Sequence, residues 1–575
     1  MPTFMTAANL VQEPPAATAT VRGVDFRIRL ITTLEQLEEQ CDEGLLGGWN
    51  DLIAADRFAH LNQSPAWCLP WYRAYRDRFE PLVVSVWRAS VLCGLAPLAV
   101  ERRRGRLTFA GDNLADYRDV LASPDALDAL LSEVIAQYRR TPRTAPLRIG
   151  PTQPGSPTVE AVTALCGRTG AGWTKLATEQ CCRLEFSPEE LQKIAKKKWI
   201  RYSLNQYKKE GPVRLEVVSS PARWSEIRDL LYDHHSLRQL HANRPVSFND
   251  PAKRAFYDAL VAADHSPMHV ALLHAGNQIV AEHCGYIWRG NLTMGVPGFN
   301  ALEERRSPGL VLLSLLFQDA AAAGLTGVDF TAGADSYKLR FSNTTVDLPV
   351  AEVYCRRTPF VLQAVQGSCR SVLRALRRRI PESARAWAER LRVRRGDKSA
   401  DRSDVPVAAE PSGVGRRGTH VVYAYQLSAV GSHMPESPTA AAVHVHRNEL
   451  RPLLRGNVAE SRLRKLIRHL VEGARAGDTV YTLTRRGELL GWARSRLANG
   501  PLVAREDGRA VESKSETVVI LGFRILTTEP EVFSMALGAL FGELSGTSNR
   551  DVLFLTTDAI SPEQRSGPAV RLVSV

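Results

Sequence analysis

The chain has 575 residues, which is more than one hydrophobic core usually organises, so its length predicts two to four domains. A hydrophobic content of 44% with 23% charged residues is typical of a globular protein rather than a disordered or fibrous one. The formal net charge of +13 favours an anionic partner but does not indicate a fold. No uninterrupted apolar run has the length that spanning a bilayer requires, and we expect a cytoplasmic protein.

The N-terminus and the cysteines exclude two further classes. Residues 1–23 are rich in Ala, Thr and Pro and lack a basic region followed by an apolar one, so we expect a disordered lead rather than a signal peptide. The 9 cysteines are odd in number and show no repeated spacing, which argues against a disulfide framework. Cys181 and Cys182 are adjacent and cannot clamp a metal ion in the usual way, and no second Cys/His pair stands at zinc spacing. We therefore expect no metal site.

The first of two predicted halves spans residues 24–211. Its patterns indicate strands at 26–30, 81–88, 92–100 and 147–149 and helices around 34–55, 66–76 and 125–138. The loop before the last of these helices, 121–125, contains no glycine and carries an acid. We therefore expect no phosphate binding in this half.

The second half spans residues 212–360 and contains a β-rich run followed by a helix with clear start and stop signals. Strands are predicted at 268–274, 278–288 and 292–296, with Gly-containing turns between them. A helix over 310–323 follows, with Pro308 at its first turn and Gly324 beyond its end, and then a strand at 327–330. Several free N–H groups and the positive end of the dipole make this helix N-terminus a place for a phosphate group.

The spacing Arg306-x-x-Gly309 resembles the pyrophosphate-binding signature [QR]-x-x-G-x-[GA] of the GNAT superfamily, although Val311 stands where Gly or Ala is usual. The segments IVAEHCGYIW, RRSPGLVLLSLLFQDAAAAG and VDFTAGADSYKLRF, together with WNDLIAADRFAHLNQSPAWCLPWYRAY, GLAPLAVERRRGRLTFAG and DNLADYRDVL upstream, resemble cellulose-biosynthesis-type GNAT acyltransferases over roughly 25–360. The resemblance implies an α/β (α+β) fold with two tandem GNAT-like mixed-sheet lobes, of which only the second binds acetyl-CoA or another acyl-CoA. The expected cofactor-binding residues are Val296, Arg305, Arg306, Ser307, Pro308, Gly309 and Leu310.

Four residues are candidates for the catalytic site of acyl transfer from a thioester, which requires proton transfers. Tyr337 could donate the proton to the departing thiolate, and Lys338 could contact phosphate or an acidic acceptor. His283 matches a histidine often found at this strand position in the resembling family, and its alternative role is that of a hydrogen-bonded core histidine. Asp329 ends the strand after the cofactor helix, where it could instead only cap the following turn. Tyr337 and Lys338 match the family's Tyr-Lys pair, and packing of the tyrosine beside a solvated lysine is the alternative.

The remainder of the chain reads as accessory. Segment 361–395 is basic and helical, and its part 370–395 could contact an anionic membrane, with a solvated helix or RNA contact as alternatives. Residues 396–419 read as a linker, and 420–575 as a further α/β module that could again be GNAT-like. Its loop 527–531 carries acids where a diphosphate would need bare N–H groups, so we expect it to be non-catalytic.

We therefore predict an acyl-CoA-dependent N-acyltransferase acting on a small amine or sugar, for example in envelope polysaccharide metabolism. A Fem-type transferase using aminoacyl-tRNA and a non-enzymatic scaffold in polysaccharide assembly are the alternatives. Aromatic residues are sparse among the basic clusters, which disfavours a nucleic-acid partner.

Overall fold

The computed structural model describes most of residues 17–355 and, further along, mainly the 443–497 region and isolated strands. The described ranges are 17–21, 24–112, 114–141, 145–355, 421–425, 443–456, 458–497, 503–506, 509–512, 517–525, 535–536, 539–540, 543–544, 551–556 and 571–574. The basic segment 361–395, the linker 396–419 and the loop 527–531 lie outside the described residues. Within the described parts, no helix has both the length and the apolar character needed to cross a bilayer.

The first sheet has six strands in the order β1-β2-β3-β4-β5, with β6 paired to β4. Its strands are β1 (Ala17–Val21), β2 (Val24–Ile31), β3 (Phe79–Arg88), β4 (Val91–Glu101), β5 (Arg106–Phe109) and β6 (Leu121–Ala122). The expected disordered lead therefore contains a strand, because β1 extends the free edge of β2 as an antiparallel partner. Its helices are α1 (Leu34–Gln40), η2 (Cys41–Leu45), α2 (Leu46–Ala55), η3 (Leu61–Gln63), α3 (Pro65–Ala74), α4 (Leu127–Arg140) and α5 (Thr158–Thr169).

The second sheet has eight strands in the order β7-β14-β8-β13-β12-β11-β10-β9. Its strands are β7 (Leu147–Ile149), β8 (Trp173–Glu185), β9 (Val213–Val217), β10 (Met268–Ala275), β11 (Gln278–Trp288), β12 (Asn291–Phe299), β13 (Gly327–Ala332) and β14 (Thr344–Tyr354). Its helices are α6 (Pro188–Ala195), α7 (Lys198–Lys208), α8 (Pro221–His241), α9 (Pro251–Ala262), η4 (Ala301–Arg306), α10 (Pro308–Ala322) and α11 (Ser336–Phe341). Both sheets and their helices confirm the predicted mixed α/β class.

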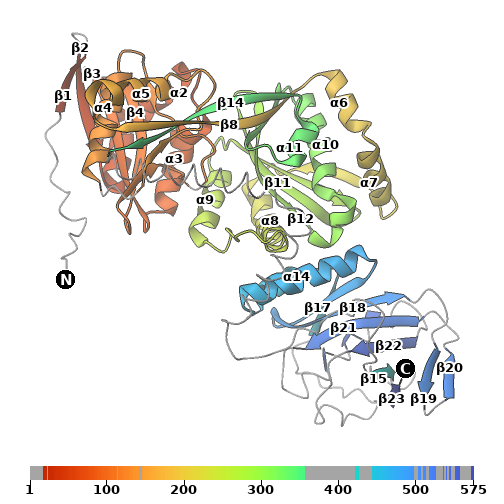
Figure 1. The fold of residues 1–575 in the computed structure, drawn as a ribbon. Coiled ribbons are helices and arrows are strands. Elements are labelled where there is room, and N and C mark those ends of the chain that lie inside the picture. Colours follow the sequence, from red (N-terminus) through yellow and green to blue (C-terminus); the bar gives the residue numbers. More distant parts are fainter. Residues whose placement is uncertain are drawn as a thin grey trace, which may run out of the picture.

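Strands β8 and β14 form a long antiparallel ribbon that joins the first two units (Figure 1). At one end β14 pairs with β7, and at the other end β8 pairs with β13. The expected boundary at residue 211 consequently does not coincide with a sheet boundary, because β8, α6 and α7 precede it in sequence but belong to the second sheet and its helices.

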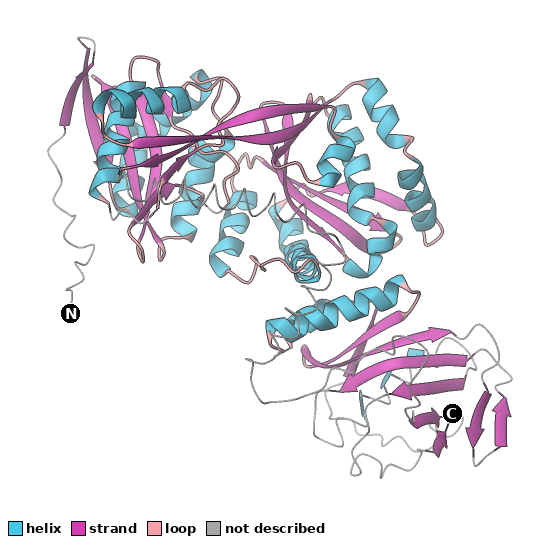
Figure 2. Ribbon diagram, viewed as in Figure 1, coloured by secondary structure: helices cyan, strands magenta, loops and turns pink. Residues whose placement is uncertain are grey.

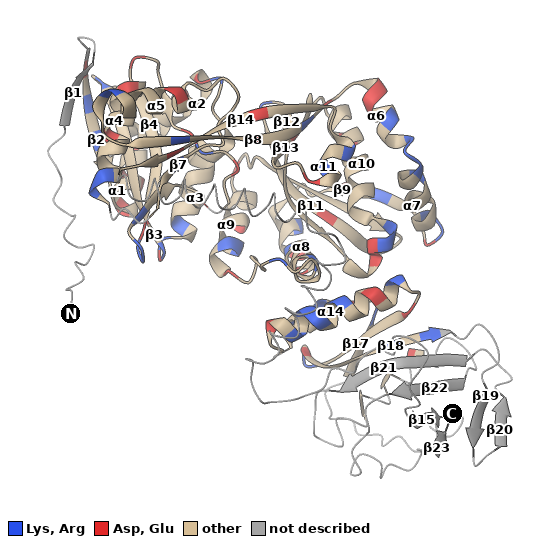
Figure 3. Cartoon of the chain, viewed as in Figure 1, with Lys and Arg blue, Asp and Glu red and all other residues tan. Residues whose placement is uncertain are grey.

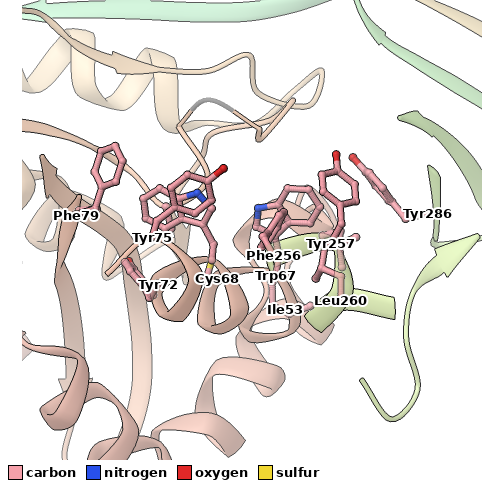
Figure 4. Packing of buried hydrophobic residues seen from close by; sticks show 14 of the residues in the cluster. Ile53, Trp67, Cys68, Tyr72, Tyr75, Phe79, Phe256, Tyr257, Leu260 and Tyr286 are labelled. Carbon is pink, nitrogen blue, oxygen red and sulfur yellow. The ribbon is translucent and has the colours of Figure 1, made fainter. Parts of the chain in front are cut away.

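A shared apolar core also connects these two units. Aromatic side chains of α3, among them Trp67, lie against Phe256 of α9, and the ring centroids of these two are 4.9 Å apart (Figure 4). Tyr286 of β11 reaches the same cluster, with its ring centroid 5.9 Å from that of Trp67. Edge-to-face aromatic packing of this kind favours a fixed arrangement of the two units.

The third sheet has nine strands in the order β16-β17-β18-β21-β22-β15-β23-β19-β20. Its elements are β15 (Val421–Tyr425), β16 (Val443–Arg447), η6 (Arg451–Arg455), α14 (Glu460–Arg475), β17 (Thr479–Arg485), β18 (Glu488–Leu497), β19 (Val503–Glu506), β20 (Arg509–Glu512), β21 (Thr517–Ile525), β22 (Asp551–Thr556) and β23 (Arg571–Ser574). β17, β18 and β21 are antiparallel and β22 is parallel to β21, which repeats the pattern of β10 to β13. Helix α14 joins this unit to α8 and η4 (Figures 1 and 2).

Candidate functional site

The central feature of the second sheet is a parallel strand pair that separates partway along. β12 and β13 pair only at Asn291–Gly327, Leu292–Val328 and Thr293–Asp329. Beyond Thr293, β12 continues to Phe299 with β11 as its neighbour, whereas β13 turns toward β8. Among the described residues, no strand pairs with this later edge of β12. The Gly295 N–H and the Pro297 carbonyl contact His283 and His235, so an extended ligand would bind the other backbone groups of this edge.

Two glycines let β12 approach its neighbours closely in this stretch. A Cβ on Gly295 would lie 2.4 Å from the Cys284 carbonyl oxygen, and one on Gly298 would lie 2.8 Å from Oε2 of Glu282. The backbone contact excludes a side chain at Gly295, and a side chain at Gly298 would require Glu282 to move. The sequence Met294-Gly295-Val296-Pro297-Gly298 thus fits the widened strand pair.

Helix α10 follows β12 after the short helix η4, and it contacts both β12 and β13. Ser307 before it adopts a left-handed conformation, with φ 52° and ψ 51°. The N–H groups of Leu310 and Val311 both donate to the Ser307 carbonyl, at 3.0 and 3.2 Å, and Pro308 has no N–H. Gly309 is therefore the residue of this turn whose N–H has no backbone partner within the described chain, which is fewer free groups than the sequence predicted.

The two arginines before this helix contact protein groups. Arg306 makes ion pairs of 2.5 Å with Glu210 and 3.3 Å with Glu303. Arg305 donates to the main-chain carbonyl of Arg475 in α14 at 3.4 Å. Contact of either arginine with a diphosphate stays a prediction.

The two other expected cofactor residues differ in their surroundings. Val296 is buried in the core that α8, α9 and the first unit share. Leu310 packs at the edge of the core beneath α10. A contact of Val296 with a ligand would therefore involve its backbone.

His283 lies on the face of β11 opposite Glu282 and is 1% exposed. Its Nε2 accepts a hydrogen bond from the Gly295 N–H at 3.2 Å, and its Nδ1 has no partner among the described residues. Burial lowers the pKa of His283 to about 3, and nearby His269 contributes in the same direction. The ring is thus neutral at physiological pH, and its catalytic role stays a prediction.

Asp329 lies in the pairing region of β13 and holds several partners. Its Oδ2 accepts a 2.8 Å hydrogen bond from the Tyr117 hydroxyl and lies 3.6 Å from the Arg183 guanidinium. Its Oδ1 accepts from the Thr331 N–H at 2.7 Å and from the Cys181 thiol at 3.2 Å. The turn-capping contact that the sequence offered as the alternative is therefore present, beside contacts that link Asp329 to the first unit.

Tyr337 and Lys338 lie in α11, the short helix after β13. Lys338 is buried and donates to the carbonyls of Ala332 at 2.8 Å and Thr331 at 3.4 Å, so it holds the end of β13 rather than standing in solvent. Tyr337 is half-buried near Arg238 of α8. Burial raises the pKa of Tyr337, and the positive charge of Arg238 opposes this.

Sequence reasoning missed a buried pair on the other face of β11. Oε1 of Glu282 lies 2.9 Å from Nδ1 of His234 in α8, and both side chains are almost fully enclosed. Oε2 of Glu282 has no partner among the described residues. The sequence did not indicate this contact, because the histidines of α8 do not reveal which strand the helix will cover.

Sequence reasoning also missed Asp116, in the loop after β5. Burial and the nearby Asp329 raise the pKa of Asp116 to about 7, whereas Lys338, a hydrogen bond from Thr331, and Arg118 act in the opposite direction. Asp116 is partly exposed and lines a cavity of about 530 Å³. Within the described residues, no His, Cys, Asp and Glu cluster has the arrangement needed to hold a metal ion.

Comparison with known proteins identifies the separated strands and α10 as parts of a recognised domain. Residues 195–339 match the family model described as "Acetyltransferase (GNAT) domain". This segment contains β12, α10 and β13. No curated protein matches the chain.

Several solved structures resemble the chain at low identity. FemX is 10% identical, covering 55% of this chain and 98% of its own, with a TM-score of 0.41. The C-terminal domain of a putative lysylphosphatidylglycerol synthetase from Agrobacterium fabrum is 13% identical, covering 56% and 95%, with a TM-score of 0.34. A tandem GNAT protein from the clavulanic acid biosynthesis pathway is 12% identical, covering 57% and 98%, with a TM-score of 0.33.

Proposed function

We propose that this chain, which carries a GNAT acetyltransferase domain at residues 195–339, moves an acyl group from acyl-CoA to an amine or sugar acceptor. The observation that supports this most is the separation of β12 from β13 beyond Thr293, directly before the N-terminus of α10. The edge of β12 can hydrogen-bond an extended chain that carries amide groups. The free Gly309 N–H and the positive end of α10 suit a phosphate group at one end of that chain.

The reaction needs few protein groups once the thioester is held. An amine must lose a proton to attack the thioester carbon, and the departing thiolate must gain one. Tyr337, in α11 after β13, can donate the proton to the thiolate. His283 can hold the Gly295 N–H of β12 in place as a neutral acceptor.

A second candidate donor is aminoacyl-tRNA, which would make the chain a Fem-type transferase. Exposed cations gather on and beside α7, which packs against α10 (Figure 3). They are Lys196, Lys198, Arg201, Lys208 and Lys209. An extended basic surface of this kind attracts a polyanion.

Calorimetric titration of the whole chain with acetyl-CoA distinguishes these donors. We expect one molecule of acetyl-CoA per chain, with micromolar or tighter affinity, and no competition by aminoacyl-tRNA. No heat with acetyl-CoA, together with salt-dependent binding of aminoacyl-tRNA, would favour the Fem-type donor. A role in envelope polysaccharide metabolism, cytoplasmic location and lipid contact through 370–395 stay predictions.

A further inference from the structure

We infer that the cavity beside Asp116 is the acceptor site and that it takes a small zwitterionic amine, with Asp116 facing the amine and Arg118 facing an acidic group. This inference rests on the proposed acyl transfer and adds the chemical class of the acceptor. The argument starts from where the cavity lies and which of its charges are unpaired.

The cavity lies between the first unit and the β8–β14 ribbon. Its walls come from β5, the loop that contains Asp116 and Arg118, the residues around β7, and the ribbon strands. Ala332, at the end of β13, also lines it, which brings one end of the cavity to the strand that separates from β12. A volume of about 530 Å³ is in the range of small-molecule sites.

Most charged side chains in the cavity wall already have partners. Arg106 pairs with Asp112 at 2.5 Å and with Glu101 at 3.1 Å. Arg148 pairs with Glu179, and Glu352 lies 3.3 Å from Lys175. These paired groups leave little net charge for a ligand.

Asp116 and Arg118 are the exceptions. Among the described residues, neither forms an ion pair within 4.0 Å, although Thr331 donates a hydrogen bond to Asp116 and Lys338 lies near it. The buried Nε of Arg118 has no hydrogen-bond partner among these residues. Arg118 donates through Nη2 to the Asp112 carbonyl, which holds the side chain without neutralising it. The wall therefore keeps one negative and one positive group unpaired, and a ligand that carries both charges would complement them.

One short loop brings both groups to the cavity wall. Asp116 lies at a bend of this loop, and one residue separates it from Arg118. Asp116 and Arg118 both line the cavity, whereas Tyr117 between them points away to Asp329. An ammonium and an acidic group a few bonds apart in one molecule match this spacing.

Asp116 lies near groups of several other elements, which place it on the face of the second sheet opposite α10. Its charge acts on Tyr257 of α9, Tyr286 of β11 and Tyr337 of α11, and Asp329, Thr331 and Lys338 adjoin it from β13 and α11. Helix α10 packs against the opposite face of the strands, in a separate core that excludes the first unit. A donor held near α10 and an acceptor at Asp116 would thus approach the separated strands from different sides.

The reaction that follows balances as written. The ammonium gives one proton to the Asp116 carboxylate, and the neutral amine forms an N–C bond with the thioester carbon. The C–S bond then breaks, and the second nitrogen proton ends on the thiolate through Tyr337 or water. The products are an amide, a free thiol and one proton, which Asp116 returns to solvent.

Acyl transfer assays on the full chain test this inference. Thiol release from saturating acetyl-CoA is measured with glucosamine, a cationic amine without an acidic group, with glucosamine 6-phosphate, and with the twenty α-amino acids in turn. We expect turnover with at least one amine that carries an acidic group and much weaker turnover with glucosamine. With that acceptor, Asp116→Asn should lower kcat/KM by at least about 100-fold.

Substitution of Arg118 separates recognition of the acidic group from folding. Arg118→Gln should raise KM for the acidic acceptor by about tenfold, whereas Arg118→Lys should keep most of the affinity. The matched controls Asp51→Asn and Arg104→Gln change exposed residues and should behave like the unaltered chain. Thermal unfolding of each variant checks its fold.

Two kinds of failure can be told apart. If acetyl-CoA binds but no acidic amine turns over, or glucosamine is preferred, or Asp116→Asn keeps full rate, the acceptor assignment is wrong. If acetyl-CoA itself does not bind in calorimetry, the proposed acyl-CoA chemistry fails instead.

Discussion

The hydroxyl of Tyr117 donates a 2.8 Å hydrogen bond to Oδ2 of Asp329, across 212 residues of sequence. Tyr117 belongs to the loop after β5 of the first sheet, and Asp329 lies in β13, where β13 still pairs with β12. The same loop carries Asp116 and Arg118, so this bond fixes the proposed acceptor wall against the strand that separates from β12. The first unit thereby contributes directly to the candidate site.

Removing the Tyr117 hydroxyl should weaken this connection. Tyr117→Phe leaves Asp329 with Cys181, Thr331 and Arg183 but removes a buried hydrogen bond to a charged group, which should cost about 1–3 kcal/mol of unfolding free energy. Chemical denaturation measures this loss, and acceptor KM should rise while acetyl-CoA affinity is retained. The exposed Tyr202→Phe is the control, and equal stability of the two variants would contradict the prediction.

Gly309 should tolerate a side chain structurally but not functionally. A Cβ at this position would meet only the Phe299 ring, at an ordinary 3.5 Å, so Gly309→Ala and Gly309→Asp should both fold. The aspartate places a carboxylate where a diphosphate is expected, and acetyl-CoA affinity should fall by at least about tenfold, or 1.4 kcal/mol. Calorimetry that shows unchanged affinity for the folded Asp variant would contradict the cofactor assignment.

The pKa of Asp116 predicts the pH dependence of turnover. Burial and Asp329 raise this pKa to about 7, so the carboxylate that accepts the proton becomes populated as the pH rises through 7. We expect kcat/KM of the unaltered chain to rise as the pH increases through 7, and this rise should be missing in Asp116→Asn. If the rise persists in the variant, another group is responsible for the pH dependence.

The same shift has an opposite consequence for stability. Because the folded chain holds this proton more tightly than the unfolded chain, whose carboxyl has the ordinary value of 3.8, ionisation of Asp116 destabilises the fold increasingly between about pH 4 and pH 7. Asp116→Asn should therefore gain stability relative to the unaltered chain as the pH rises. Urea unfolding at pH 5 and pH 8 measures the difference.

Local signals in the sequence predicted the centre of the second sheet well. Alternation and glycine turns located β10, β11 and β12, and Pro308 with Gly324 marked the ends of α10 within a residue or two. These signals are short-range, so they remain readable without knowledge of the packing. Strand β8 was not predicted, because its first half is exposed, as shown by Leu176 at 58% exposure, and lacks the run of apolar residues that marks a buried strand.

The acceptor wall could not be predicted for a different reason. Asp116 and Asp329 are brought together only when the first and second sheets meet at the β8–β14 ribbon, and no spacing in the sequence encodes that meeting. The segment DNLADYRDVL carried a family resemblance, yet the unpaired charges of Asp116 and Arg118 become evident only once the partners of their neighbours are known. Burial lowers the pKa of His283 to about 3, which the sequence could not indicate, and its role as a base stays a prediction.

The third unit packs directly against the segment that leads into α10. Ile467 and Leu470 of α14 lie in one apolar cluster with Leu302 of η4. Glu304 of η4 pairs with Arg475 of α14, and Arg305 donates to the carbonyl of the same arginine. Helix α14 therefore helps to fix the turn that presents the Gly309 N–H, although the sequence suggested that this unit is dispensable for the cofactor.

Loosening α14 should consequently weaken cofactor binding from a distance. Ile467→Asp buries an unpaired charge in this interface, and we expect α14 to separate from η4 and acetyl-CoA affinity to fall severalfold while the second sheet stays folded. Calorimetry measures the affinity, and protection of η4 amides from hydrogen exchange should fall in parallel. Ser461→Asp makes the same charge change at an exposed position of α14 and should alter neither quantity. Full affinity in Ile467→Asp with exposed η4 amides would show that the third unit is independent of the cofactor site.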